Sequence, residues 1–247
     1  MYSAISFAKS AFGEPASDPL CSSIAAVAGP RHHGGMSTEI PGAAELNLPQ
    51  AFLLLATNDK DGEPEVPQSV LKAALSGAIL AELDLLGAIQ LQGKYVRATG
   101  APPQSDFQHQ WELIHDKSRP HSPRRWVAML ESRAELHRVY EGMAALGVVT
   151  RVGEKHLGVF RTTRYPEKDH APEAALLARI ESILSGSPSD ARTAALIGLL
   201  HAAGLMDKLF PGAGPARIRE LAGDHWPSRA VRDELRMIRL AEAEAAT

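Results

Sequence analysis

The sequence predicts a mainly α-helical fold: a compact single-domain helical bundle around buried central helices, with two projecting β-hairpins. Two Ala/Leu-rich segments, 68–86 and 192–206, lead to this class because they are long enough for helices and apolar over most of their surface. Segments of strand character are short and follow a glycine in two places. A helix that is apolar all round must be covered on every side, so these two helices are expected at the centre of the bundle.

The 247-residue chain changes character near residue 46. Residues 1–46 are rich in Ser, Ala, Gly and Pro and lack a sustained apolar period, so we expect a disordered N-terminal extension there and a helical domain over 47–247. Cys21 is the one cysteine of the sequence, which excludes an intrachain disulfide and fits a reducing compartment. We find neither a signal peptide nor an apolar run that would span a bilayer, and therefore expect a cytoplasmic protein.

The elements follow in order from Pro49, which suits the first turn of a helix that runs until the polar turn 58–62. The helix over 68–86 is expected to end at Gly87. The same order of helix, glycine and hairpin recurs at Gly147. The first hairpin is predicted over 89–91 and 95–99, and the second over 148–152 and 156–163, with a polar tip at 153–155. Further helices are predicted at 106–116, 123–146, 172–185, 215–222 and 228–245.

Glu82 is an acid on an apolar helix face, because at 100° per residue it lies with Leu71, Leu75 and Ala78. A buried carboxylate needs a cation or backbone donors. We interpret Glu82 as structural, either in an internal ion pair or as a cap for a neighbouring helix.

Charge is informative by segment. The whole chain has a formal charge of −3, which gives no general case for nucleic-acid binding. Residues 115–165 carry ten Lys and Arg against five acids, a local balance of +5. This basic block would attract phosphate groups or an anionic lipid surface, although a solvated face is the commoner explanation of such a run.

Motifs of catalysis and metal binding are missing from the sequence. The turn 58–63 resembles a calcium loop, but Thr57 and Gln68 stand where its first and last acids belong. The glycines near 212–214 do not follow a strand, so they form neither a dinucleotide fingerprint nor a phosphate loop. We therefore predict a protein that is not an enzyme, with no cofactor and no metal.

Several ordered segments resemble the Golgi phosphoprotein 3 family, cytosolic peripheral membrane proteins with relatives in bacteria, among which we would place this chain. The resemblance runs from Leu48 to about Leu240 and rests on LPQAFLLLATNDKDGEP, on LKAALSGAILAELDLLGAIQL, on the helix with Trp126, on LGVV with its hairpin, and on RTAALIGLLHAAGLMDKLF. It implies a helical core with projecting hairpins. It also implies binding of phosphatidylinositol 4-phosphate and an adaptor role that recruits glycosyltransferases.

The family's lipid pocket uses one Trp and three Arg. The Trp position falls near Pro67 here, and the Arg positions hold Ser76, Arg133 and Leu136, with Arg138 nearby. Arg133 alone keeps the family charge. From the resemblance and the basic block we predict a peripheral association with the cytosolic face of a membrane through anionic phospholipids. The predicted head-group ligands are Arg133, Arg138, Arg151 and Arg161, and the predicted membrane-facing hairpin residues are Val152, Leu157, Val159 and Phe160.

Two other functions stay open at this point. A helix followed by a glycine and a hairpin is also the order of a winged-helix nucleic-acid-binding regulator, for which 134–146 would be the recognition helix. The other alternative is a module that binds only a protein client. Because the helix before the first hairpin is apolar, we expect no nucleic-acid partner.

We predict that a chain beginning at Asn47 folds, because residues 1–46 offer no periodic apolar face to a core. Limited proteolysis should cut this extension first, and the truncated chain should melt close to the full-length protein. A melting temperature far below that of the full chain would contradict this boundary.

Overall fold

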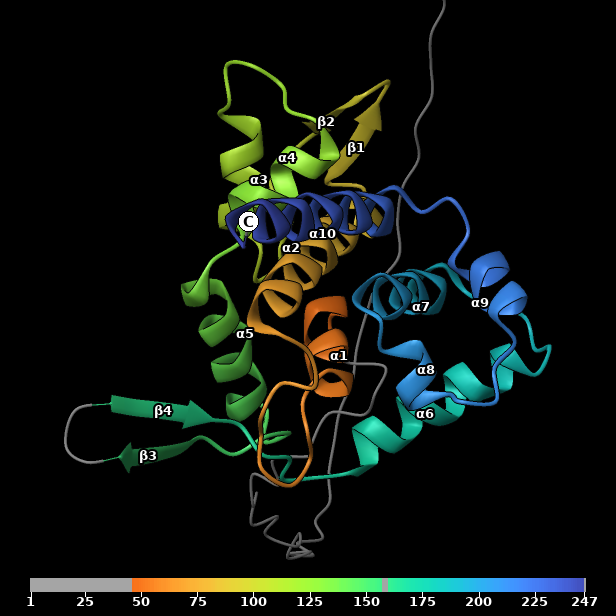
Figure 1. Ribbon diagram of the computed structural model, residues 1–247. Helices are drawn as coiled ribbons and strands as arrows, with labels where there is room; N and C mark the ends of the chain where they lie inside the picture. The colour runs from red at the N-terminus through yellow and green to blue at the C-terminus, as the bar shows by residue number, and fades with distance from the viewer. Residues whose placement is uncertain (1–45, 157–159, 247) are drawn as a thin grey trace, which may run out of the picture. The chain divides into compact units, whose positions relative to one another are not determined.

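The computed structural model describes residues 46–156 and 160–246, and the mainly helical class is confirmed (Figure 1). Of the predicted extension only Leu46 lies within the described residues, where it is buried. The described elements are α1 (Leu48–Leu55), α2 (Gln68–Leu85), β1 (Ile89–Gln92), β2 (Tyr95–Ala98), α3 (Gln108–His115), α4 (Pro123–Leu130), α5 (Arg133–Ala145), β3 (Val152–His156), β4 (Phe160–Arg164), α6 (Ala171–Leu184), α7 (Ala191–Ala203), α8 (Met206–Leu209), α9 (Pro215–Ala222) and α10 (Trp226–Ala245).

Helix α2 lies at the centre of the bundle and packs against α1, α4, α7 and α10 (Figure 1). Residues 73–83 are all buried, and so are residues 195–200 of α7. The helices cross closely at Gly77, where a Cβ atom would lie 2.1 Å from Val231 Cγ2 of α10. A larger residue at this position would have to push the two helices apart.

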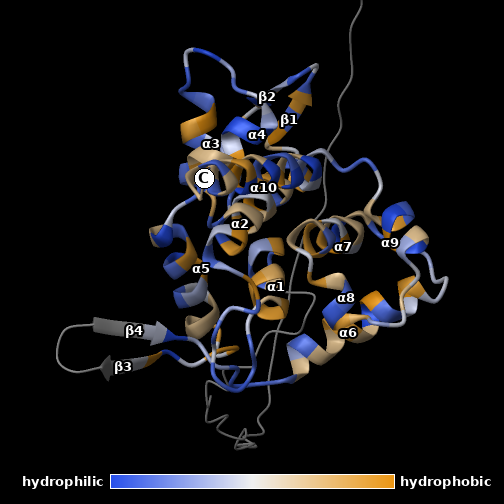
Figure 2. Ribbon diagram, viewed as in Figure 1, coloured by the Kyte–Doolittle hydropathy of each residue, from blue (hydrophilic) through white to orange (hydrophobic). Residues whose placement is uncertain are grey.

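Helices nearer the surface bury one face. In α5 the buried residues are Leu136, Val139, Tyr140 and Met143, which repeat at helical spacing. Figure 2 shows hydrophobic and hydrophilic residues on the same helix in α5 and α10. This single buried face fixes which side of α5 remains open to solvent.

The helix predicted over 123–146 is in fact two helices, α4 and α5. Glu131 leaves the helical conformation with ψ of 108°, and Ser132 begins the next helix. The Ser132 hydroxyl accepts hydrogen bonds from the backbone N–H groups of Ala134 and Glu135. A serine cap of this kind competes with helix continuation, which the apolar period alone did not reveal.

Both hairpins follow a helix that ends in the same way. Gly87 and Gly147 follow α2 and α5 with φ of 67° and 79°. In each case the next residue donates its backbone N–H to a carbonyl five residues earlier, from Ala88 to Leu83 and from Val148 to Met143. The first hairpin agrees with its predicted position to within one residue.

The second hairpin begins later than predicted. Val148 and Val149 are buried in the core ahead of β3, and Val149 makes an isolated antiparallel bridge with Glu167. Val152 pairs with Arg164 and Gly153 with Thr163, which places the predicted tip, 153–155, inside β3. The pairing ends at His156 and Phe160, and the three residues between them lie outside the described residues.

Glu82 is buried, with 5% of its surface exposed, and connects three helices. Its Oε2 accepts the backbone N–H of Leu48 at 2.7 Å, at the first turn of α1. The same carboxylate takes two hydrogen bonds from Arg192 of α7, at 2.7 and 2.9 Å. Glu82 is therefore both the ion-pair partner of Arg192 and a hydrogen-bond acceptor at the first turn of α1.

We predict that Glu82→Ala lowers the free energy of unfolding by about 2–3 kcal/mol, because it leaves the Leu48 N–H and the Arg192 guanidinium without their acceptor. Glu82→Gln should cost less, since it keeps the shape and one acceptor oxygen. Glu220→Ala is the matched control, because Glu220 pairs with Arg217 at 3.0 Å on the surface, where 68% of its side chain is exposed. Urea unfolding would contradict the prediction if Glu82→Ala and Glu220→Ala were equally stable.

Candidate functional site

A pocket of about 610 Å³ lies between residues 62–68, the first half of α5 and the end of β4. Three basic side chains line it: Arg133, His137 and Arg164. Pro64, Val66, Pro67 and Leu136 add an apolar wall. We call it the α5–β4 pocket.

Helix α5 presents two of the basic groups. Arg133 is its first residue, placed there by the Ser132 cap, and is exposed. His137 follows one turn later, so both side chains lie on the same side of the helix. Leu136 lies between them in sequence. It is 5% exposed, belongs to the hydrophobic core and contributes to the apolar wall of the pocket. The start of the helix also directs the positive end of its dipole toward this side of the molecule.

Arg164 is the last residue of β4 and its side chain is 27% exposed. Its Nη2 atom lies 2.7 Å from Oε1 of Glu63, which belongs to the turn that forms the opposite wall. The ion pair holds the guanidinium at the pocket while leaving part of it accessible to solvent. An anion in the pocket could therefore contact Arg133, which is exposed to solvent, and Arg164, which is paired with Glu63.

Two stacked tyrosines, Tyr140 and Tyr165, also line the pocket. The rings of Tyr140 and Tyr165 are 4.5 Å apart and nearly parallel, and the Tyr140 hydroxyl lies 2.6 Å from Oγ1 of Thr57. Burial raises the pKa of both phenols to about 12, and the hydrogen bond to Glu141 adds to the effect at Tyr165. Both hydroxyls therefore stay protonated near neutral pH.

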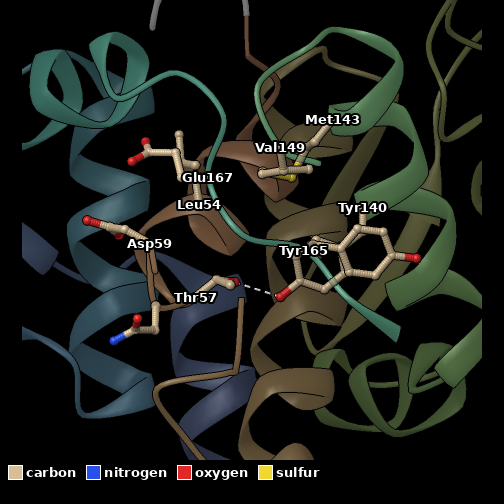
Figure 3. A pocket seen from close by; sticks show the side chains of 9 residues that line it. Leu54, Thr57, Asp59, Tyr140, Met143, Val149, Tyr165 and Glu167 are labelled. Atoms are coloured by element: carbon tan, nitrogen blue, oxygen red, sulfur yellow. Dashed lines mark hydrogen bonds between the residues drawn. The ribbon is translucent and has the colours of Figure 1, made fainter. Parts of the chain in front are cut away.

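A small cavity of about 10 Å³ lies beside the stacked tyrosines, about the size that one water molecule needs. Figure 3 shows the two rings on one side of it and the carboxylates of Asp59 and Glu167 on the other. The tyrosine pair therefore separates the α5–β4 pocket from an acidic region.

That acidic region contains four side chains that could hold a metal ion: Asp59, Glu167, His170 and Glu173. Burial, and then the charges of Asp59 and Glu167, raise the pKa of Glu173 to about 8. The pKa of His170 is also raised, mainly by its hydrogen bond to Glu167. Three carboxyl groups therefore lie close together here, with the imidazole of His170 among them.

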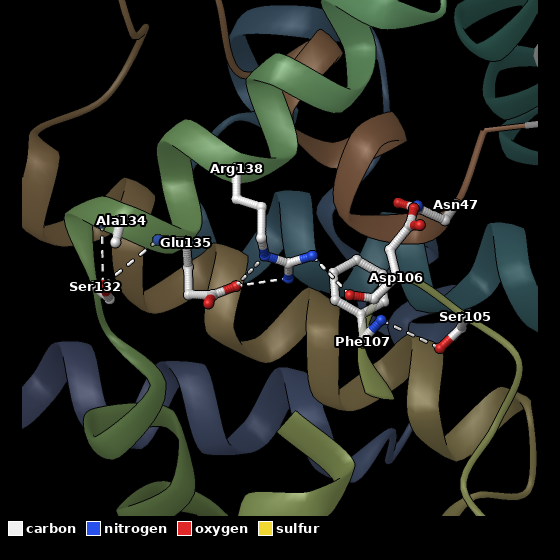
Figure 4. Close-up of polar contacts among 8 residues, drawn as sticks. All are labelled: Asn47, Ser105, Asp106, Phe107, Ser132, Ala134, Glu135 and Arg138. Carbon is white, nitrogen blue, oxygen red and sulfur yellow. Dashed lines mark hydrogen bonds and ion pairs between the residues drawn. The ribbon is translucent and has the colours of Figure 1, made fainter. Parts of the chain in front are cut away.

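Arg138, a predicted head-group ligand, has a different position. Its Nε and Nη2 atoms bond Oε2 of Glu135 at 3.0 and 2.6 Å, and its Nη1 donates to the backbone oxygen of Asp106 at 2.6 Å (Figure 4). Its guanidinium lies 5.2 Å from the centre of the Phe107 ring. These contacts tie α5 to the segment before α3, so the structure does not bring Arg138 together with Arg133.

The other predicted basic ligands also lie apart from the pocket or cannot be described. Arg151 pairs with Glu141 at 3.2 Å just before β3. Arg161 lies in β4 opposite Lys155, but its side chain is outside the described residues. Ser76, at a position where the resemblance implies an Arg, is 1% exposed and bonds the Lys72 carbonyl inside the core.

Of the predicted membrane-facing residues, Val152 is 40% exposed at the start of β3. Phe160 begins β4, but its side chain lies outside the described residues, as do Leu157 and Val159 entirely.

The sequence interpretation did not select His137 and Arg164 as ligands. His137 would have been found from the helical spacing to Arg133. Arg164 belongs to the basic block, but the predicted strand ended at Thr163, one residue too early. A predicted strand one residue longer would have included Arg164, the last residue of β4.

The fold and the pocket define a helical scaffold with a surface pocket that three basic side chains line. The chain matches the Golgi phosphoprotein 3 (GPP34) family over residues 48–238 and belongs to that family. A search of curated proteins finds no match. Within residues 46–156 and 160–246, none of the helices has the length and apolar character needed to cross a bilayer.

We predict that Gly62→Ala disrupts the wall of the pocket. Gly62 has φ of +68°, and a Cβ atom there would lie 2.4 Å from the backbone nitrogen of Pro166 and 2.5 Å from the backbone of Tyr165. The variant should lose roughly 2 kcal/mol or more of stability, because it combines backbone strain with a backbone clash.

Gly93→Ala is the control for Gly62→Ala, because Gly93 has a similar φ of +61° with open space at the Cβ position. It should lose only the conformational part, about 1 kcal/mol. Equal losses of melting temperature in the two variants would show that the turn does not press on Tyr165.

Proposed function

We propose that this protein binds anionic phospholipid head groups in the α5–β4 pocket and works as a peripheral adaptor at the cytosolic face of a membrane. The observation that carries the proposal is the meeting of Arg133, His137 and Arg164 around one open pocket. Three of the four positions at which the family resemblance implies lipid ligands, Pro67, Arg133 and Leu136, line the same pocket.

The chemistry of the pocket supports a phosphate ligand. A guanidinium donates two parallel hydrogen bonds to phosphate oxygens, and Arg133 is exposed and available to do so. The Tyr165 hydroxyl donates to Glu141, so it accepts from Nδ1 of His137 at 3.2 Å, and Nε2 of His137 donates to a phosphate when the ring is doubly protonated. Arg164 would exchange part of its contact with Glu63 for the ligand.

Selectivity among anionic lipids should be modest. Pro67 and Leu136 offer no charge at two of the four family positions, and Ser76 lies in the core. Binding would then depend on the charge of the head group more than on the pattern of phosphates around an inositol ring. Phosphatidylinositol 4-phosphate is one candidate ligand among lipids of equal charge.

The second hairpin would face the membrane in this arrangement. Val152, Leu157, Val159 and Phe160 would supply apolar contact, with Arg151 and Arg161 at the level of the head groups. Each basic residue close to an anionic leaflet contributes about 1 kcal/mol. The remaining surface of the bundle would be free to bind a protein client, in keeping with the adaptor role that the family implies.

We predict that the full-length protein sediments with phosphatidylcholine vesicles that contain phosphatidylinositol 4-phosphate or phosphatidylserine at matched charge. Arg133→Glu should weaken this binding roughly tenfold or more, because it replaces attraction to the surface with repulsion. Higher salt should weaken it as well through screening. Pure phosphatidylcholine vesicles should bind little protein.

Arg125→Glu is the matched control, because Arg125 is exposed on α4, does not line the pocket, and changes the net charge by the same amount. If Arg125→Glu and Arg133→Glu weakened vesicle binding equally, the attraction would be diffuse and not centred on the pocket. No vesicle binding by the folded protein at low salt would overturn the membrane proposal and favour a protein-interaction module. Binding to duplex DNA instead would favour the winged-helix alternative.

A further inference from the structure

Four side chains from two distant parts of the chain converge outside the α5–β4 pocket. Asp59 belongs to the turn after α1, Glu167 follows β4, and His170 and Glu173 lie at the start of α6. A backbone hydrogen bond from Glu167 to the Asp59 carbonyl, 3.0 Å long, holds the two segments together. One ligand atom from each of the four side chains lies within 4.8 Å of every other.

The imidazole stands among the three carboxylates. Nδ1 of His170 lies 2.8 Å from Glu167, 3.3 Å from Glu173 and 4.0 Å from Asp59. Two ligands of one small divalent ion lie at most about 4.2 Å apart, because each is about 2.1 Å from the ion. The cluster therefore needs only a small contraction, at an exposed turn, to reach coordination distances.

Two oxygen atoms in the cluster are buried and accept no hydrogen bond from the described residues: Oε1 of Glu167, and Oε2 of Glu173, which has only the ion-pair contact with Nδ1 of His170 at 3.3 Å. Their side chains are only 8% and 6% exposed. A buried carboxylate oxygen normally accepts a hydrogen bond or binds a cation. Oε1 of Glu167 therefore lacks a partner among the described residues, and Oε2 of Glu173 shares the one imidazole with Glu167; both atoms are open to a cation.

We propose that Asp59, Glu167, His170 and Glu173 form a binding site for a divalent first-row transition metal ion. Carboxylate oxygens alone would suit Mg²⁺ or Ca²⁺, but an imidazole nitrogen among them favours Mn²⁺ or Zn²⁺. Asp59, Glu167 and Glu173 would coordinate a divalent ion as carboxylates, and the ion would balance their charge and contact both buried oxygens.

The site opens on one side into a pocket of about 310 Å³, which is lined by Asp59, His170 and Glu173 together with Lys60 and Lys208. Solvent therefore reaches the cluster, so an ion has a path of entry. Water from this pocket would complete the coordination. The site is separate from the α5–β4 pocket, and its test does not depend on lipid binding.

The experiment is calorimetric titration of Mn²⁺, and separately of Zn²⁺, into chelator-treated full-length protein. We expect one bound ion per chain, with a rise in melting temperature of roughly 5–10 °C at a free metal concentration about 100 times Kd. Mg²⁺ and Ca²⁺ should bind more weakly. In the Mn²⁺ complex, the electron paramagnetic resonance signal should report the loss of free aqueous ion.

Glu173→Gln and His170→Ala should each weaken Mn²⁺ binding by about tenfold or more while the protein remains folded in the presence of chelator. The matched control is His115→Ala with Asp116→Asn, which removes an exposed His–Asp pair at 2.9 Å and should leave the affinity unchanged. Glu173→Gln keeps the size and shape of the side chain, so folding should not suffer.

The proposal is overturned if the folded protein binds neither Mn²⁺ nor Zn²⁺, because His170 alone would then be the counter-ion of the cluster. It is also overturned if both variants bind as tightly as the wild type, which would place the ion elsewhere in the chain. Equal affinity for Mg²⁺, unaffected by His170→Ala, would contradict the choice of a transition metal.

Discussion

The carboxylate of Glu82 is the interaction on which the rest of the bundle depends. A helix that is buried on all sides has no polar surface of its own, so its position relative to its neighbours would be set by packing alone. Glu82 adds direction, because it bonds the first turn of α1 and the Arg192 guanidinium of α7 from one point on α2. Close packing at Gly77 then fixes the third neighbour, α10. Specific orientation is what a buried polar group can contribute to a core that apolar contacts stabilise.

The core in turn determines where the surface sites form. Helix α5 buries one face against the bundle, and this leaves Arg133 and His137 on the side that faces the turn 62–68. The turn is held close to Tyr165 because residue 62 has no side chain. The pocket is therefore bounded by a helix, a strand end and a tight turn.

The sequence predicted the elements whose signals are local. Apolar periodicity located α2 and α7, and the same periodicity placed Glu82 on a buried face. It failed where a side-chain hydrogen bond or a glycine gave a misleading local signal. The Ser132 cap divides one predicted helix into two, and Gly153, predicted at the tip of the second hairpin, lies within β3.

The sites were harder to predict than the fold because they depend on contacts between distant residues. Arg133 was selected from the family resemblance, whereas Arg164 reaches the same pocket only through the register of β4. Glu167, His170 and Glu173 are three residues apart, which is a local signal, but Asp59 is more than one hundred positions away from them. A single sequence without contacts carries no information that would join them.

The short stretch that follows β4 has a consequence for how the two proposed sites behave together. Arg164 and Tyr165 line the α5–β4 pocket, while Glu167, two residues on, belongs to the acidic cluster. The turn after α1 is shared in the same way, with Glu63 at one site and Asp59 at the other. Any ligand that orders these two segments would lower the entropy cost of ordering them again for the second ligand. By thermodynamic reciprocity, the ion would then raise the affinity for the head group by the same factor as the head group raises the affinity for the ion.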